Sequence, residues 1–189
     1  LIMASIVSCI VFFVIGHGIV PDMITMGKPM GNGIPISGLA AKEDVLAAFS
    51  DKLPYFNTFG GNPVSIAAAQ AVLKYIKDEN LQEHCKKAGA ALLKALKEVQ
   101  ERHPESVGDV RGAGLFLGFE FVKNDGNKTS DKDMALNVIE MLRDEHILTS
   151  VIGHYGNILK LRPPMVFSEN DIDWFATSLD KCITKLENK

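Results

Sequence analysis

The feature that most limits the fold of this chain is a long amphipathic helix pattern over residues 81–102. Its apolar side chains recur every three or four residues, at Leu81, Cys85, Ala88, Leu92, Leu96 and Val99. This spacing gathers them into one stripe on a single helix face. Asn80 is a suitable N-cap, and Pro104 follows the predicted end. A stripe of this length needs an apolar partner, so we predict that the helix packs on a sheet.

The residues after this helix alternate between strand and helix patterns, which indicates a compact α/β unit. Strands are predicted at 107–111, 115–122, 147–151 and 158–161. A helix is expected around Met134, Ala135, Val138, Ile139 and Leu142. The run Ser168-Glu169-Asn170-Asp171 is a capping-box start for a last helix. Its inner face is predicted to carry Ile172, Phe175, Leu179, Ile183 and Leu186.

Composition narrows the classes of function. The chain has 189 residues with 47% hydrophobic content, enough for one or two globular domains. Its formal net charge of −3 gives no basic footprint for nucleic acid. Three scattered cysteines suit a reducing compartment, and five histidines without ligand spacing make a metal site unexpected.

The uncharged run Leu1–Ile15 has two interpretations. It is long for one strand but shorter than the roughly 20 apolar residues that span a bilayer. It also lacks the basic region and the cleavage site of a signal peptide. A broken core strand is favoured over a membrane anchor, which stays open as the alternative.

Lys28 is the most conspicuous lysine because of its surroundings. A short apolar stretch, Met23 to Met26, precedes it and is predicted to be a buried strand. Glycines and prolines follow and force a tight loop. A lysine held out of water at such a junction has a lowered pKa and an amine that can attack an aldehyde carbon. The alternative is a surface lysine in a turn.

A second run, Tyr55-Phe56-Asn57-Thr58-Phe59-Gly60-Gly61-Asn62-Pro63, leads into a helix predicted over 64–77. Asn62 suits the N-cap and Pro63 the first helical position. We expect the backbone N–H groups of the two glycines and the Thr58 hydroxyl to form a phosphate site. The alternative is a simple turn that begins a helix.

Together these runs resemble the class III aminotransferases, a fold-type I family of pyridoxal 5'-phosphate enzymes. The resemblance implies that Lys28, within Pro21-Asp22-x-x-Thr25-x-x-Lys28, is the catalytic residue and holds the cofactor as a Schiff base. It implies that Thr58 binds the cofactor phosphate of the neighbouring subunit in a homodimer. The run Val107-Gly108-Asp109-Val110-Arg111-Gly112-Ala113-Gly114-Leu115 resembles the start of the family's small domain.

The expected fold class is therefore α/β, the end of a fold-type I large domain followed by a small carboxy-terminal α/β domain. Residues 1–79 are the predicted remnant of the cofactor-binding domain, and residues 80–189 the small domain. Family members carry an aspartate for the pyridine nitrogen in an earlier strand, where Ser5 of Ala4-Ser5-Ile6-Val7-Ser8 stands here. A catalytically incomplete fragment that acts as a dimer partner is therefore the alternative function. The resemblance allows a mitochondrial or a cytosolic location.

The segment Asn157-Ile158-Leu159-Lys160-Leu161-Arg162-Pro163-Pro164-Met165 bears on the substrate. In many family members an arginine stands at the position of Lys160 and binds the substrate carboxylate through its planar guanidinium group. A lysine lacks this two-pronged geometry. Lys160 and Arg162 are the expected substrate-binding residues, and solvated charges are the alternative. This segment, with the runs 26–33 and 55–61, is most similar to the phospholyase branch, which acts on phospho-amines such as ethanolamine phosphate. The sister branch is that of the mitochondrial alanine–glyoxylate aminotransferases of type 2. Transamination and phosphate elimination both stay open.

Overall fold

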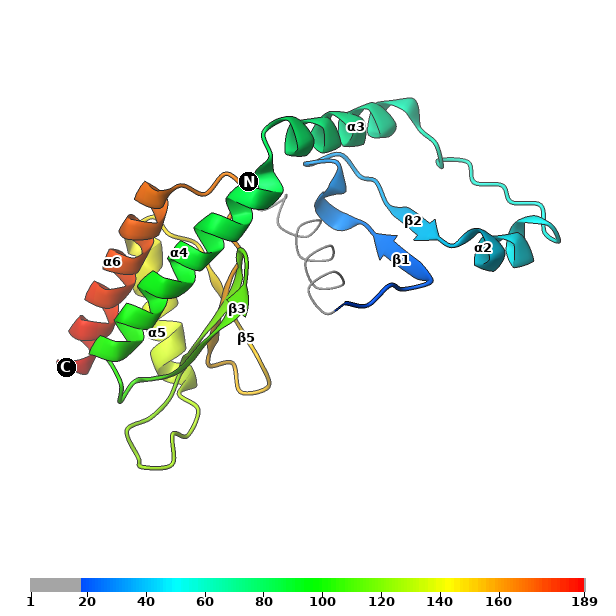
Figure 1. The fold of residues 1–189 in the computed structure, drawn as a ribbon. Helices are drawn as coiled ribbons and strands as arrows, with labels where there is room; N and C mark the ends of the chain where they lie inside the picture. The colour runs from blue at the N-terminus through cyan, green and yellow to red at the C-terminus, as the bar shows by residue number, and fades with distance from the viewer. Residues whose placement is uncertain (1–17, 189) are drawn as a thin grey trace. The chain divides into compact units, whose positions relative to one another are not determined.

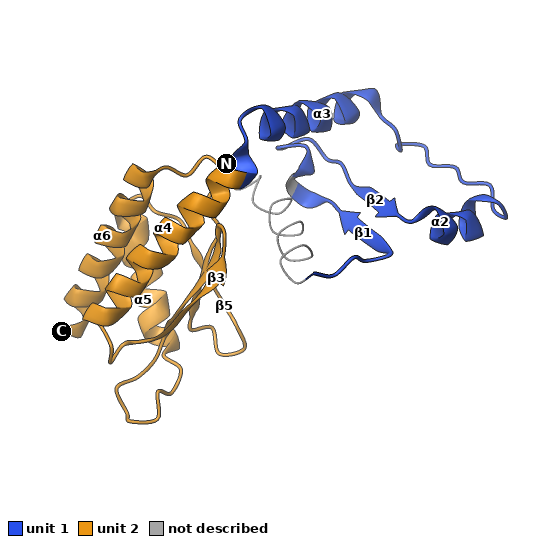
Figure 2. Cartoon of the chain, in the orientation of Figure 1, with its two compact units in different colours: residues 1–82 blue, residues 83–189 orange. Residues whose placement is uncertain are grey.

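The computed structural model describes residues 18–188 (Figure 1). Predictions for Leu1–Ile15, including the role of Ser5, therefore lie outside the described residues. The chain divides into two compact units, Leu1–Gln82 and Glu83–Lys189 (Figure 2). We call them unit 1 and unit 2. Their assignment to a cofactor-domain remnant and a small carboxy-terminal domain stays a prediction.

The described residues of unit 1 form a two-stranded sheet and two α-helices before α4. Its elements are β1 (Met23–Met26), the 3₁₀ turn η1 (Lys28–Met30), β2 (Gly38–Ala41), α2 (Glu43–Ser50) and α3 (Pro63–Asp78). The strands are antiparallel, with Met23 opposite Ala41. The predicted strand before Lys28 is therefore confirmed, but its predicted burial is wrong. Met23 is 55% exposed, because β1 pairs with β2 alone among the described strands.

The start of α3 has the predicted cap, with Asn62 as the N-cap and Pro63 as the first helical residue. The Asn62 side-chain oxygen accepts hydrogen bonds from the backbone N–H groups of Val64, at 3.0 Å, and Ser65, at 3.2 Å. Pro63 occupies the first helical position, where its missing N–H costs nothing. The helix boundary is thus set by two adjacent residues.

Unit 2 has three helices against one face of a four-stranded antiparallel sheet (Figure 1). The strands lie in the order β3-β4-β6-β5. The elements are α4 (Leu81–Arg102), β3 (Val107–Ala113), β4 (Phe116–Phe121), α5 (Lys132–Asp144), β5 (Ser150–Ile152), β6 (Ile158–Leu161) and α6 (Glu169–Glu187). The unit boundary falls within the first turn of α4.

The predicted stripe of α4 is confirmed as core. Leu92, Leu96 and Val99 are at most 1% exposed, and the facing sheet residues Phe119 and Leu159 are fully buried. The inner faces of α5 and α6 complete this core with Ala135, Val138, Leu142, Leu179 and Ile183, all 0% exposed. Burial of each large apolar side chain contributes about 1.5–3 kcal/mol.

One glycine permits the close approach of helix and sheet. A Cβ atom added to Gly89 of α4 would lie 2.2 Å from the carbonyl oxygen of Gly114, in the β3–β4 turn. Gly114 itself has φ of +54°, in the left-handed region that glycine adopts readily. Gly89 therefore makes room for the turn against α4, and Gly114 supplies the backbone conformation of that turn.

Two parts of the fold differ from the sequence prediction. β5 begins at Ser150 instead of residue 147, because the end of α5 continues into a turn. There the Ile147 N–H donates to the Leu142 carbonyl at 2.8 Å, and His146 adopts φ of +64°. The elements β2 and α2 were not predicted. Gly38-Leu39-Ala40-Ala41 has no apolar alternation, and none of the residues of α2 is buried.

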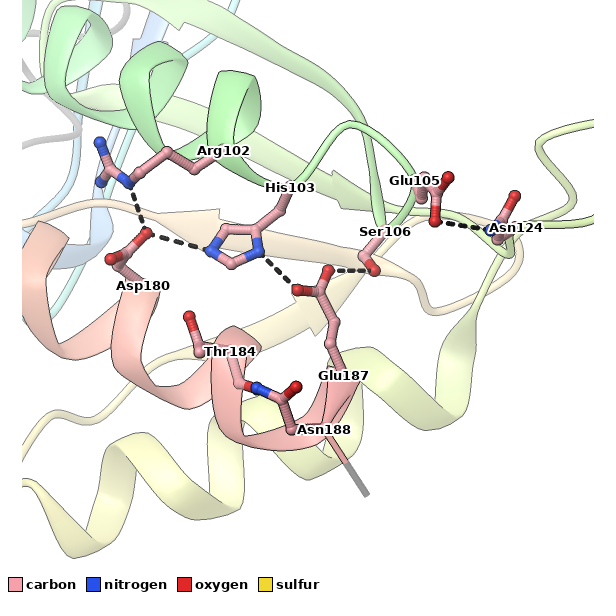
Figure 3. Close-up of polar contacts among 9 residues, drawn as sticks. All are labelled: Arg102, His103, Glu105, Ser106, Asn124, Asp180, Thr184, Glu187 and Asn188. Atoms are coloured by element: carbon pink, nitrogen blue, oxygen red, sulfur yellow. Dashed lines mark hydrogen bonds and ion pairs between the residues drawn. The ribbon is translucent and has the colours of Figure 1, made fainter.

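A cluster of charged side chains ties the end of α4 to α6 (Figure 3). His103, only 6% exposed, places Nε2 3.0 Å from Asp180 Oδ1 and Nδ1 2.7 Å from Glu187 Oε2. Arg102 Nε donates to the same Asp180 oxygen at 2.7 Å. The Ser106 hydroxyl donates to Glu187 Oε1 at 2.6 Å. These residues form the α4–α6 clasp, which sequence analysis did not foresee.

The electrostatics of the clasp favour the ionised form of Asp180. Burial raises the pKa of Asp180, but hydrogen bonds from Arg102 and His103 outweigh it, so the pKa lies below its ordinary value. A depressed carboxyl pKa stabilises the fold at pH values above the ordinary carboxyl range. That contribution is lost as pH falls through the depressed value.

The clasp gives a first prediction. Asp180→Asn should lower the free energy of unfolding at pH 7 by about 1–3 kcal/mol, because Arg102 and His103 lose a charged acceptor. The difference from the unaltered chain should begin to shrink below about pH 4, the ordinary carboxyl pKa, and should shrink further as pH falls through the depressed pKa of Asp180. Urea unfolding at several pH values measures both effects.

A control for this prediction is Arg143→Gln, whose ion pairs with Glu140 and Asp144 lie at the surface. It should change stability by less than about 1 kcal/mol. An equal loss in the two variants, or a difference that does not depend on pH, would contradict the role given to the clasp.

The capping box of α6 gives a second prediction. Ser168 Oγ accepts from the Asp171 N–H at 3.3 Å, and the Ser168 N–H donates to Asp171 Oδ2 at 2.8 Å. Ser168→Ala should cost about 1 kcal/mol, and Ser168→Asn, which keeps an acceptor, should cost much less. The hydrogen bonds from Ser168 also hold the pKa of Asp171 below its ordinary value. That pKa should rise in the alanine variant, as measured by an NMR titration.

Candidate functional site

Lys28 lies at the junction that the sequence predicts, directly after β1 and Gly27. Its backbone has φ of +54°, in the left-handed region that costs a residue with a Cβ atom about 1 kcal/mol or more. Such conformations are enriched at functional sites but are not specific to them. Lys128, in a loop of unit 2, has φ of +52°.

The environment of Lys28 differs from the expectation. The side chain is exposed, so the predicted removal of its amine from water is wrong for the described part of the chain. Within the described residues, the strand before it pairs with β2 alone. Within residues 18–188, the amine has no hydrogen bond or ion pair. By contrast, Lys42 is engaged 2.6 Å from Asp22.

The Thr58 loop is built around two asparagines. Asn57 Oδ1 accepts from the N–H groups of Phe59, at 3.2 Å, and Gly60, at 3.0 Å. The expectation that both glycine N–H groups are open is therefore wrong for Gly60. Gly61 has φ of +73°, and its N–H has no acceptor in the described structure. Thr58 is exposed beside these groups.

Lys28 and Thr58 both belong to unit 1, and no hydrogen bond joins them within the described residues. Lys160 and Arg162 belong to unit 2. Each unit therefore contains two of the four predicted site residues.

In unit 2, charged side chains gather on the sheet face that points away from the unit's own helices. The register aligns Arg111, Gly118, Lys160 and Ser150 in one row across the four strands. The neighbouring row contains Val110, Phe119 and Leu159, which point into the core. Because directly paired residues share a face, the first row points away from the helices. We call it, with Phe116, Glu120 and Arg162, the outer face.

Lys160 and Arg162 have no carboxylate partner among residues 18–188. Lys160 is half-buried between Gly118 and Ser150, and Gly118 leaves space beside it. The Arg162 guanidinium lies 6.0 Å from the centre of the Phe116 ring, a cation–π contact. Two cations that no acid neutralises leave this end of β6 able to bind an anion.

Arg111 is the third cation of the outer face, and its charge is already matched. Its Nη1 atom lies 2.6 Å from both Asp109 Oδ2 and Glu120 Oε2. The hydrogen bond to Glu120, followed by that to Asp109, raises the pKa of Arg111. Sequence analysis treated Arg111 only as part of a strand and missed this pairing. A signal was available in the sequence. Asp109 and Arg111 are two residues apart on one predicted strand and Glu120 lies on the next, so the three side chains could be expected to share a face of the sheet.

Metal and membrane sites are not evident in the part of the chain that the structure describes. No group of three or more histidine, cysteine, aspartate or glutamate side chains there is arranged to hold a metal ion. Among those same residues, no helix has both the length and the apolar character that crossing a bilayer requires.

Comparisons with known proteins identify the family. A model of the aminotransferase class-III family matches residues 11–183. The chain is 45% identical over 168 residues to ethanolamine-phosphate phospho-lyase homolog 1 of Caenorhabditis elegans, covering 88% of this chain and 36% of the relative. It is 36% identical to the mitochondrial alanine–glyoxylate aminotransferase 2 homolog 2 of Arabidopsis thaliana, covering 90% of this chain and 35% of that relative.

Solved structures show the same relationship. An Arthrobacter phospholyase in complex with phosphoethanolamine superimposes with a TM-score of 0.84 and 37% identity, covering 88% of this chain and 39% of that one. A transaminase from a marine Virgibacillus gives a TM-score of 0.85 with 28% identity, covering 93% of this chain and 41% of that one. The chain thus spans little more than a third of the length of these relatives, over a part of the fold-type I aminotransferase architecture. By sequence and by fold, this chain belongs to the class III aminotransferases.

Proposed function

We propose that this chain carries part of the active site of a pyridoxal-phosphate-dependent, phospholyase-like enzyme that acts on a small phospho-amine. The observation that carries the proposal is the pair of unneutralised cations, Lys160 and Arg162, on a chain that also presents a free lysine amine at Lys28. Supporting it, one relative is named for ethanolamine phosphate, and a related structure contains phosphoethanolamine.

The groups present in unit 1 fit pyridoxal phosphate. Lys28 offers an unpaired amine for the cofactor aldehyde, and Thr58 with the Gly61 N–H offers hydrogen-bond donors for its phosphate. In keeping with the family resemblance, we assign Thr58 to the cofactor of the neighbouring subunit in a homodimer. When bound, the cofactor supplies an electron-withdrawing ring that stabilises negative charge on the carbon next to the substrate nitrogen.

Lys28 is the proposed proton carrier. Its amine takes a proton from the carbon that bears the substrate nitrogen, and phosphate leaves the neighbouring carbon in an elimination. A transaminase differs in returning that proton to the cofactor. Efficient proton transfer requires a cover that excludes water from Lys28. We assign that cover to a partner subunit or to further residues of a longer protein.

Lys160 and Arg162 are proposed to bind the anionic end of the substrate. A phosphate dianion carries more charge than a carboxylate and suits two cations without a fixed fork geometry. Because Lys160 stands where many family members have arginine, this arrangement favours phosphate over carboxylate. Phosphate elimination is therefore our preferred reaction and transamination the alternative. Two relatives are mitochondrial by name, and a mitochondrial or cytosolic location is proposed for this chain.

A second candidate function is a catalytically incomplete partner in a dimer. The exposure of both Lys28 and Thr58 favours it, because neither residue has the covering that catalysis needs. Turnover of phosphoethanolamine by the 189-residue chain alone, measured as released phosphate, would exclude this alternative.

The role of Lys28 is testable by reductive trapping. Borohydride reduction of the chain with pyridoxal phosphate should fix the cofactor mainly on Lys28, as read by peptide mass spectrometry. Lys42 is a matched internal control, because its amine is paired with Asp22 at the other end of the same sheet. The Lys28→Arg variant should lose that adduct and keep any background on other lysines. Equal labelling of Lys28 and Lys42 would count against the proposal.

The anion site is testable by NMR titration with phosphoethanolamine. Lys160→Gln and Arg162→Gln should each weaken binding about tenfold, since each removes a charged donor to phosphate. Lys123→Gln, which alters an exposed lysine just after β4, is the control and should bind as the unaltered chain does. Ethanolamine, which lacks phosphate, should bind all variants equally weakly. If it bound as tightly as phosphoethanolamine, the phosphate assignment would fail.

A further inference from the structure

The charges of the outer face raise a question of selectivity, because an acid lies within reach of Lys160. In the β4–β6 pair, Gly118 is opposite Lys160 and Glu120 is opposite Ile158. Glu120 is therefore the diagonal neighbour of Lys160 on the same face of the sheet. Cross-strand diagonal pairs of long side chains are close enough to interact. A glutamate in this position is expected to neutralise the lysine.

The structure shows a different pairing for Glu120. Its Oε2 atom accepts from Arg111 Nη1 at 2.6 Å, and its Oε1 atom lies 3.4 Å from Asn157 Nδ2. Asn157 is 1% exposed and fixed in place, because the same Nδ2 donates to the Phe121 carbonyl at 2.8 Å. Glu120 thus binds Arg111 of β3 through one oxygen and Asn157, next to the start of β6, through the other, and it forms no ion pair with Lys160 within the described residues.

Arg111 and Lys160 are both possible partners for the Glu120 carboxylate, and Arg111 is the stronger one. Its guanidinium bridges Glu120 and Asp109, each at 2.6 Å, so both acids of this part of the outer face are paired with the same cation. The charged hydrogen bonds are stronger than those that a single flexible lysine makes. Arg111 also lies in the same row as Lys160, separated from it by Gly118. The glycine has no side chain to mediate a contact between them.

We propose that Arg111 is a positioning residue that holds Glu120 away from Lys160 and so keeps the Lys160 ammonium available to the anionic group of the substrate. This inference rests on the proposed function, since it gives the reason why Lys160 is unpaired. Arg111 itself contributes no contact to the substrate. Its effect is on the local charge that an incoming phosphate meets, which is positive at Lys160 only while Glu120 is engaged elsewhere.

A double-mutant cycle tests the proposal. Arg111→Gln should release Glu120 toward Lys160 and weaken phosphoethanolamine binding about fivefold, an effect of the size of one partly exposed charge pair. Glu120→Gln alone should leave binding unchanged or slightly tighter. The double variant Arg111→Gln/Glu120→Gln should bind within about twofold of the unaltered chain, because no acid is then free to pair with Lys160. A merely structural role for Arg111 predicts no such rescue.

A measurement without ligand separates this inference from the proposed function. NMR of the Lys160 side-chain amine reports whether Glu120 approaches it, through changed ¹⁵N and ¹H shifts and slower hydrogen exchange. These changes should appear in Arg111→Gln and be absent from the double variant. If they appear but phosphoethanolamine binds none of the proteins, the proposed anion site fails and the role of Arg111 stands. If Lys160 is unaffected in Arg111→Gln, the inference is overturned whatever the ligand does.

Discussion

The packing of the α4 stripe on the sheet is the interaction on which the rest of unit 2 depends. Leu92, Leu96 and Val99 exclude water from one face of the sheet, and Gly89 lets the helix reach the β3–β4 turn. With that face covered, the alternating residues of β4 and β6 must point to the other side. The charged outer face is therefore a geometric consequence of the apolar core, since the same strands supply both.

Much of unit 2 could be predicted because its signals are local. Apolar spacing fixes α4, α5 and α6, and Ser168 and Asp171 define a helix start through their own hydrogen bonds. The boundary of β5 was less predictable, since Ile147 continues an apolar run but its N–H is captured by the end of α5. In unit 1, Asn62 and Pro63 marked α3 reliably. The strand β2 carries no periodic signal, and it forms because β1 offers it a partner.

The candidate site shows the limit of reasoning from sequence. The motif predicts a functional role for Lys28. The solvent exposure of its amine, however, depends on the tertiary packing around it, and here the lysine is exposed. The pairings of Arg111 with Glu120 and of His103 with Asp180 were also missed, because they join residues from different elements. Their roles follow from strand register and helix packing, which a pattern along one chain does not contain.

The strand order β3-β4-β6-β5 also has a consequence for how unit 2 folds. Its two outer pairs are hairpins between neighbouring strands, and each closes only a short loop. Loop-closure entropy is small for such pairs, so both hairpins are expected to form early. The central β4–β6 pairing spans α5 and is the slow, long-range step. A newly synthesised chain is therefore most prone to aggregate after the hairpins form and before β4 pairs with β6, because each hairpin then has an unpaired edge strand.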